Sequence, residues 1–119
     1  MSELVLIVDD DECVACNIQA YLEDEGFNVC VADSGEQALL LLQECSPHFA
    51  IVDMRLPGMD GNQFIRQASV IQTQLQYIIH TGSIEYTLPD FLRVNSKVRQ
   101  SVFFKPIVNM GRFVTEMCS

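Results

Sequence analysis

The stretch LVLIVDDDEC, residues 4–13, places five apolar residues directly before four consecutive acidic ones. A continuous apolar run of this length, rather than an alternating one, is typical of a strand that is buried on both faces of a parallel sheet. Like charges that lie a few ångströms apart raise one another's pKa and destabilise a fold. The sequence therefore predicts a buried strand that ends in clustered carboxylates, which some cation must neutralise.

Further apolar segments follow along the chain. Four further apolar segments are predicted strands, at residues 27–31, 49–53, 77–81 and 101–104. Between them, Asp60 is a predicted helix N-cap, and Ser34 with Gln37 is a predicted capping box. Strands that alternate with helices indicate an α/β fold, here a five-stranded parallel sheet flanked by helices on both faces.

The connection before the last predicted strand is the least regular part of the chain. Thr87 as N-cap, with Pro89 in the first turn and Asp90 at the third position, favours a helix over residues 88–98. Because this start is late, we expect an unusually long loop before it. A short last helix is predicted at residues 109–118.

Charge is distributed unevenly along the 119 residues, whose formal net charge is -9. Residues 1–54 contain no Lys or Arg and twelve of the 16 acidic residues, whereas all 7 basic residues lie from Arg55 onward. Contacts with a nucleic-acid backbone need clustered Lys and Arg, so we expect no direct nucleic-acid binding and a small cation at the acidic half. The length predicts one domain over residues 1–119.

No segment has the features of a secretion signal or of a membrane span. The apolar run after Glu3 is short, and no segment approaches the roughly 20 apolar residues of a membrane helix. Five cysteines, an odd number, favour reduced thiols over a disulfide framework. We therefore expect a soluble, cytoplasmic protein without membrane contacts. Cys13 and Cys16 form C-x-x-C inside a predicted helix, where a redox role is the less favoured interpretation.

Polar residues follow the predicted strands at the edge of the sheet where the carboxyl ends meet. They are Asp9 and Asp10 after the first strand, Asp53 at the third, Thr81 at the fourth and Lys105 after the fifth. Ligands of such sheets bind beyond these carboxyl ends. Carboxylates without nearby His or Cys suit Mg2+ or Mn2+. With the ion and Lys105 neutralising charge and Thr81 donating a hydrogen bond, a carboxylate can attack phosphorus, which predicts aspartyl phosphorylation.

Taken together in this order, the motifs resemble the receiver domain of two-component response regulators, the CheY-like superfamily. The resemblance covers nearly the whole chain and is carried by VDDD at 8–11, DMRLPGMDG at 53–61, HTG at 80–82 and FFKP at 103–106. It implies the flavodoxin-like (βα)5 receiver fold. It also implies a signalling domain rather than an enzyme, one that phosphorylates itself from a phosphodonor and slowly loses the phosphoryl group.

The resemblance further implies roles for individual residues. These are phosphoacceptor for Asp53, phosphoryl contacts for Thr81 and Lys105, and magnesium ligation by Asp53, by Asp10, by Asp9 through water, and by the backbone carbonyl of Arg55. Mn2+ is an alternative to Mg2+ at this site. Pro106 matches the family's Lys-Pro pair, in which the bond before proline is usually cis.

The implied phosphodonor is a sensor histidine kinase or a histidine phosphotransfer protein. The implied output is a further domain or a partner protein, bound by the face of the last two helices and the last strand. This face departs from the family pattern: Val102 replaces an aromatic switch residue, polar Arg99 and Gln100 replace a Gly-Ala pair, and Pro89 lies in the late helix. An alternative therefore stays open, a pseudo-receiver that acts as a phosphorylation-independent interaction module.

A phosphatase is a less favoured alternative. Haloacid dehalogenase-like phosphatases resemble this site in using Asp, Thr and Lys around Mg2+. They need a second Asp two residues after the nucleophile, where this chain has Arg55, and 119 residues leave no room for a cap domain.

The two histidines are predicted to be structural or exposed. His80 alternates with Thr81 on a strand, so the two side chains should point to opposite faces, and a general-base role for His80 is not favoured. His48 follows Pro47 in a loop and is expected at the surface.

Overall fold

The computed structural model describes residues 3–83, 86–107 and 109–118 of the chain. Within these ranges a parallel sheet has the strand order β2-β1-β3-β4-β5. Its strands are β1 (Leu4–Val8), β2 (Asn28–Ala32), β3 (Phe49–Val52), β4 (Gln76–Thr81) and β5 (Val98–Phe104). The predicted fold class and all five predicted strands are confirmed.

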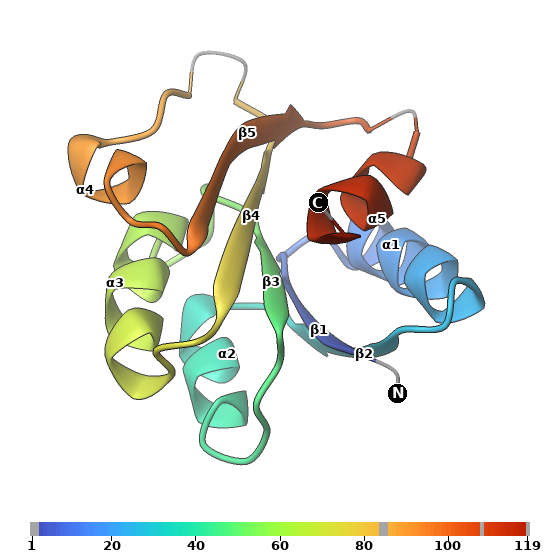
Figure 1. The fold of residues 1–119 in the computed structure, drawn as a ribbon, viewed down its shortest axis with the longest axis horizontal. Helices are drawn as coiled ribbons and strands as arrows, with labels where there is room; N and C mark the ends of the chain where they lie inside the picture. Colours follow the sequence, from blue (N-terminus) through green and yellow to red (C-terminus); the bar gives the residue numbers. More distant parts are fainter. Residues whose placement is uncertain (1–2, 84–85, 108, 119) are drawn as a thin grey trace.

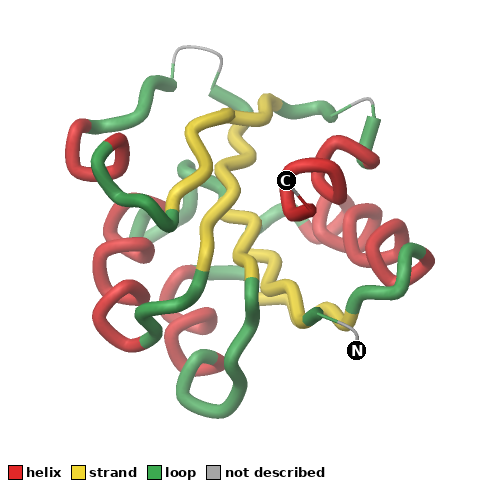
Figure 2. The backbone as a smooth tube through the Cα atoms, in the orientation of Figure 1, coloured by secondary structure: helices red, strands yellow, loops and turns green. Residues whose placement is uncertain are grey.

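Among the described residues, helices lie between and after the strands and cover both faces of the sheet. They are α1 (Glu12–Asp24), α2 (Gly35–Leu41), α3 (Gly61–Ile71), α4 (Asp90–Arg93) and α5 (Gly111–Cys118). α1 and α5 lie on one face, and α2, α3 and α4 lie on the other (Figure 1, with the same view as a tube in Figure 2). None of the described helices is long and apolar enough to cross a membrane.

The sheet separates two apolar cores, and β1 contributes to both. Val5 and Ile7 pack with Phe113 of α5 on one face, whereas Leu6 and Val8 belong to the cluster on the other face. All four strand residues have no exposed surface. This two-sided burial explains why the strand reads as an uninterrupted apolar run in the sequence.

Two helices begin with the predicted capping residues. Asp60 caps α3, and its side chain and that of Gln63 form a complete capping box. Ser34 caps α2 by accepting the N–H of Gln37. The prediction for Gln37 is wrong in one detail, since its side chain accepts from the N–H of Asp33 rather than from that of Ser34.

The predicted helix over residues 88–98 is wrong in its extent. α4 has only four residues and begins at Asp90, so its start is even later than expected. Pro89, not Thr87, occupies the N-cap position, and no side chain caps the helix by a hydrogen bond. The last helix, predicted from residue 109, begins at Gly111.

A turn and a longer β5 replace the second half of the predicted helix. The Asn95 carbonyl accepts the N–H of Val98, and the Asn95 side chain accepts the N–H of Lys97. The N–H of Tyr77 in β4 then donates to the Lys97 carbonyl, and Val98 already pairs with Tyr77. Pairing with β4 therefore overrides the local helical preference and extends β5 beyond the predicted residues 101–104.

Candidate functional site

Asp9 and Asp53 lie at the carboxyl ends of the neighbouring strands β1 and β3. The register pairs Val8 with Val52, so the acids that follow lie side by side. The N–H of Asp53 donates to the Val8 carbonyl at 2.9 Å, and the N–H of Asp9 donates to the Ala32 carbonyl at 3.1 Å. Continued strand pairing thus holds both backbones, and the two residues are only 3% and 4% exposed.

Both carboxylates are oriented in the same way. Oδ1 of Asp9 accepts the N–H of Asp11 at 2.9 Å, and Oδ1 of Asp53 accepts the N–H of Arg55 at 3.0 Å. The remaining oxygens meet one ammonium group, because Nζ of Lys105 lies 2.8 Å from Oδ2 of Asp9 and 3.0 Å from Oδ2 of Asp53. Lys105 therefore bridges two buried acids.

The ends of β4 and β5 bring Thr81 to this group. The N–H of Lys105 donates to the Thr81 carbonyl at 2.9 Å, and Thr81 pairs with Phe104 in the register. The Thr81 side chain is fully buried, and its hydroxyl oxygen accepts the N–H of Ser83 at 3.2 Å. The hydroxyl hydrogen stays able to donate. The Lys105–Pro106 bond is cis, as predicted.

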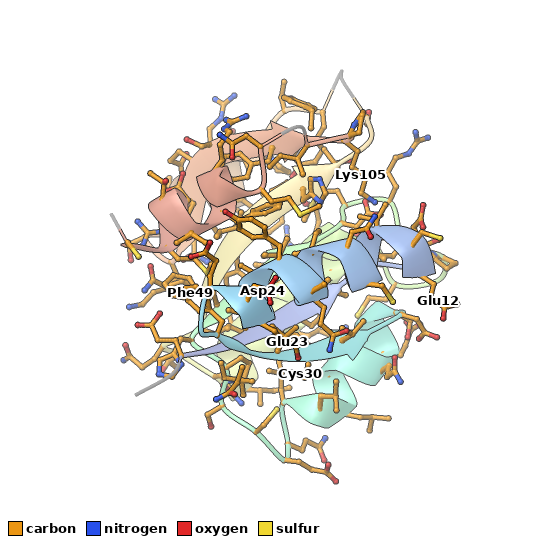
Figure 3. All side chains as sticks on the ribbon, turned by 90° about the vertical axis from the view of Figure 1, so that its right-hand side faces the viewer. Glu12, Glu23, Asp24, Cys30, Phe49 and Lys105 are labelled. Carbon is orange, nitrogen blue, oxygen red and sulfur yellow. The ribbon has the colours of Figure 1, made fainter. Side chains whose placement is uncertain are left out.

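The whole group lies at one end of the molecule. Figure 3 shows Lys105 toward the same end as Glu12, the first residue of α1, whereas Phe49, the first residue of β3, lies toward the opposite end. Because the strands are parallel, all their carboxyl ends meet at the end that holds Lys105. The structure thus brings the side chains of Asp9, Asp53 and Lys105 into contact and places Thr81 at the same edge of the sheet, as the sequence predicted.

Burial and charge act against each other in this group. Burial raises the pKa of Asp9, the hydrogen bonds from Lys105 and Asp11 lower it, and the Asp53 charge raises it further, with a net increase. Burial lowers the pKa of Lys105, but the hydrogen bonds and charges of Asp9 and Asp53 outweigh burial, so the net change is upward. Lys105 is therefore charged at neutral pH, while Asp9 lies in a place where a further positive charge would be favourable.

The acidic residues fit a hard divalent cation. Asp9, Asp10 and Asp53 each offer a carboxylate oxygen, and these oxygens lie within 4.8 Å of one another. Asp10 is exposed, which leaves an approach from solvent. A set of oxygen donors without sulfur or nitrogen suits Mg2+ or Mn2+. The contribution of the Arg55 carbonyl stays a prediction, since the contact seen for Arg55 is its N–H bond to Asp53.

The loop from β3 to α3 contains a positioning feature that the sequence analysis missed. A Cβ atom on Gly61 would lie 2.7 Å from the carbonyl oxygen of Asp53 and 2.6 Å from Cε of Met54. Glycine is therefore required for α3 to begin this close to the phosphoacceptor candidate. The available signal was a glycine directly after the predicted N-cap Asp60.

Residues outside the group lie where they were expected. His48 is exposed, and its Nδ1 accepts the N–H of Leu4 at 3.1 Å. His80 is buried among apolar residues on the α1 and α5 face, where its ring packs edge-on against Phe113. Cys13 and Cys16 are exposed free thiols on α1.

The comparison with protein families decides the identity of this fold and site. The family described as response regulator receiver domain matches residues 5–113. The chain belongs to this family. It is thus a receiver domain of the two-component response regulators, a signalling family, rather than an enzyme of the usual kind.

Curated relatives of the receiver domain are similar over part of its length. Sporulation initiation phosphotransferase F of Bacillus subtilis is 33% identical over 82 residues, which cover 69% of this chain and 66% of that protein. Transcriptional regulatory protein AruR of Pseudomonas aeruginosa is 39% identical over 83 residues, or 66% of this chain and 34% of that protein. The receiver domain therefore spans about a third of AruR.

Solved structures confirm the receiver fold. A receiver domain protein of Methanospirillum hungatei has a TM-score of 0.84 at 23% identity, with 99% of this chain and 92% of that chain covered. The response regulator TrrA of Thermotoga maritima, solved in complex with Mg2+-BeF, has a TM-score of 0.79 at 19% identity, with 97% and 98% covered. Both likenesses show the five-stranded flavodoxin-like architecture.

Proposed function

We propose that Asp53 of this receiver domain accepts a phosphoryl group in a Mg2+-dependent reaction, with a sensor histidine kinase or a histidine phosphotransfer protein as donor. One observation carries the proposal: Nζ of Lys105 lies 3.0 Å from Oδ2 of Asp53 and 2.8 Å from Oδ2 of Asp9. A buried carboxylate is thus held beside a cation and beside further acids that suit a metal ion. Thr81, at the same edge, would donate a hydrogen bond to the phosphoryl group.

In the transfer, an Asp53 oxygen forms a bond to phosphorus while the bond from phosphorus to the donor's imidazole nitrogen breaks. The imidazole leaves with the electron pair of that bond and takes up a proton. When bound by Asp9, Asp10 and Asp53, with the Arg55 carbonyl as a further proposed ligand, Mg2+ would supply positive charge to the phosphoryl oxygens. The 4% exposure of Asp53 keeps bulk water away from the acceptor.

Lys105 and Thr81 would respond to the new group. Once Asp53 forms an acyl phosphate, its carboxyl group no longer carries the negative charge that Lys105 meets in the structure. A phosphoryl oxygen then replaces that charge as the partner of Lys105, and the Thr81 hydroxyl donates to another oxygen. Since the Lys105 N–H is bonded to the Thr81 carbonyl, both residues would adjust together.

The signal would leave through the face of α4, β5 and α5. Thr81 pairs with Phe104 of β5, and Phe104 is 39% exposed on this side of the sheet. We propose that an output domain or partner protein binds there, without direct nucleic-acid or membrane contacts by this domain, which we take to extend over residues 1–119. The pseudo-receiver is the second candidate, and Val102 at the usual aromatic position supports it.

The test is phosphorylation of the purified chain by acetyl phosphate, with intact mass as the readout. Wild type and Asp53→Asn are incubated with Mg2+ and with a chelator, and Asp33→Asn, at an exposed acid, is the matched control. We expect one phosphoryl group on wild type and on Asp33→Asn in Mg2+ alone, and none on Asp53→Asn.

Two results would contradict the proposal. An adduct that persists in Asp53→Asn would place the phosphoacceptor elsewhere. No adduct in any condition, together with no Mg2+ binding in a titration, would favour the pseudo-receiver.

A further inference from the structure

Two thiols lie on the solvent side of α1, and the proposed phosphorylation uses neither of them. Cys13 is in the first turn of the helix and Cys16 follows three residues later, and both are free and exposed. The buried side of α1 carries Ala15, Ile18 and Leu22. Residues three positions apart are neighbours on a helix surface. The two cysteines therefore form a dithiol that is open to solvent.

The helical spacing of this dithiol does not suit a disulfide. Cβ atoms three residues apart on a helix are about 5–6 Å apart, whereas a disulfide needs about 3.5–4.5 Å. The N–H groups of Cys13 and Val14 donate to Oδ1 of Asp11 at 3.1 Å and 3.2 Å, so the cap holds the first turn in its helical form. An atom that bonds to both sulfurs would span the gap without a change of the backbone.

The charges around the dithiol restrict which atom can bridge it. Asp10, Asp11 and Glu12 directly precede Cys13, and all three are exposed. Two thiolates around a monovalent metal ion would carry a net negative charge, which these acids would repel. Among the described residues, no group of three ligating side chains that could hold a metal ion includes either cysteine. A bridging atom that needs only two sulfurs and adds no charge meets both conditions.

The other described cysteines do not offer an equivalent site. Cys118 is exposed on α5, with no cysteine three or four residues before it. Cys30 is half-buried, and burial, followed by the nearby Cys45 thiol, raises the pKa of Cys30 to about 11. The Cys45 thiol donates to the Leu41 carbonyl at 3.1 Å. Partly buried, protonated thiols react slowly, so a reagent in solution reaches the dithiol on α1 first.

We propose that Cys13 and Cys16 bind a trivalent arsenical, an uncharged thiophilic molecule that bridges two sulfurs. With an organic arsenic oxide, two arsenic–sulfur bonds form and the bonding between arsenic and oxygen breaks. The two thiol protons leave with that oxygen as water, so arsenic stays trivalent and the site gains no charge. The acids before Cys13 thus do not oppose binding. The binding does not depend on phosphorylation.

The test uses phenylarsine oxide as the probe and the intact mass of the full chain as the readout. The chain is kept reduced with a phosphine, because thiol reductants compete for arsenic. We expect one adduct per chain, with the mass of the probe less one water, and two fewer thiols that can be alkylated. An added dithiol should remove the adduct, whereas a monothiol at the same concentration should not.

Four variants locate the site. Cys13→Ser and Cys16→Ser each leave a single thiol on α1, and loss of the second, intramolecular bond should weaken binding of the probe by at least about 100-fold. Cys118→Ser is the matched control, since it removes an exposed thiol outside the pair and should bind as wild type does. Cys45→Ser removes the partner of Cys30 and should also bind as wild type does.

The proposal is overturned if wild type forms no adduct, or if Cys13→Ser and Cys16→Ser bind the probe as tightly as wild type. Loss of the adduct in Cys118→Ser or Cys45→Ser overturns it as well, and so does an adduct that joins two chains, as judged by sedimentation. Should a variant not fold, peptide mapping of the thiols that the probe protects in wild type decides alone. None of these readouts involves a phosphoryl group, so they stand whether or not Asp53 is phosphorylated.

Discussion

The acidic cluster, formed by Asp9, Asp10 and Asp53, and the side of the sheet formed by β4, α4 and β5 differ in how regular their backbone structure is. All four residues of β3 are buried, and Asp53 continues its pairing with β1. On the other side, α4 has four residues and no side-chain cap, and the pairing of β4 with β5 shifts register between Tyr77 and Ile79. The proposed phosphoacceptor thus follows a central strand with unbroken pairing, whereas the proposed output face contains a short helix without a side-chain cap and an irregular strand pair.

Removing the cation that bridges Asp9 and Asp53 should have the largest effect. In Lys105→Met, the buried carboxylates of Asp9 and Asp53 lose their shared partner, so we expect the free energy of unfolding to fall by about 3 kcal/mol. Urea denaturation measures the loss, and added Mg2+ should restore part of it.

The matched control for this prediction is Lys97→Met, at the residue directly before β5. Nζ of Lys97 meets Oε1 of Gln74 at 3.4 Å on the surface, so its removal should cost less than about 0.5 kcal/mol. Equal losses in the two variants would show that the bridge at Asp9 and Asp53 does not stabilise the fold.

Acid should lower the free energy of unfolding through His80, which lies near the charges of Lys105 and Asp53. The pKa of His80 is lowered from 6.5 to about 4 in the folded chain, so the unfolded chain binds more protons between these values. Stability should therefore fall as the pH drops from 6.5 toward 4, by about 3 kcal/mol in total at about 1.4 kcal/mol per unit.

Urea denaturation across this pH range measures the effect. His80→Phe should show a much flatter profile, and His48→Phe should keep the slope of wild type because His48 is exposed. Parallel profiles for wild type and His80→Phe would assign the acid sensitivity to other groups.

A smaller loss of stability is expected when α3, the helix after Asp53, loses its N-cap and so resembles the uncapped α4. Asp60→Ala leaves the N–H groups at the start of α3 without the capping box, so we expect a loss of about 1 kcal/mol in urea denaturation. Asp90→Ala, at the uncapped α4, removes an exposed carboxylate that lies 3.9 Å from Arg93 and should have little effect. A comparable loss at Asp90 would contradict the difference between the two helices.

The smallest effect is expected at the exposed end of α4. Val94 is 83% exposed, so Val94→Ser should change the free energy of unfolding by no more than about 0.5 kcal/mol. A buried residue of the same region, Leu92, has no exposed surface, and Leu92→Ala is the contrasting variant in the same denaturation experiment. A large loss in Val94→Ser would mean that this end is more tightly packed than its exposure indicates.

The central strands could be predicted because their sequence has one interpretation. The run from Leu4 to Val8 is buried on both faces, and Asp9 follows it directly, so the strand and the site emerge from the same pattern. Thr81 and Lys105 could be placed for the same reason, as polar residues at strand ends. The Gln37 cap bond was misplaced by one residue, which is within the freedom of a flexible side chain.

The α4 region could not be predicted from local signals. Pro89 and Asp90 do begin a helix, but nothing near them shows that Val98 pairs with Tyr77 and ends the helical stretch early. The close approach of Gly61 to Asp53 and the unpartnered nitrogens of His80 are likewise properties of the packed chain. Such features depend on contacts between distant segments.

The bridge made by Lys105 also has a consequence for the order in which the chain is synthesised. Lys105 follows Asp53 by 52 positions, and no Lys or Arg precedes Arg55. The acidic half therefore leaves the ribosome first, whereas a domain folds as a unit once its chain is available. Until β5 is added, Asp9 and Asp53 have no ammonium between them. Completion of the sheet and neutralisation of its acidic centre thus happen in the same late step.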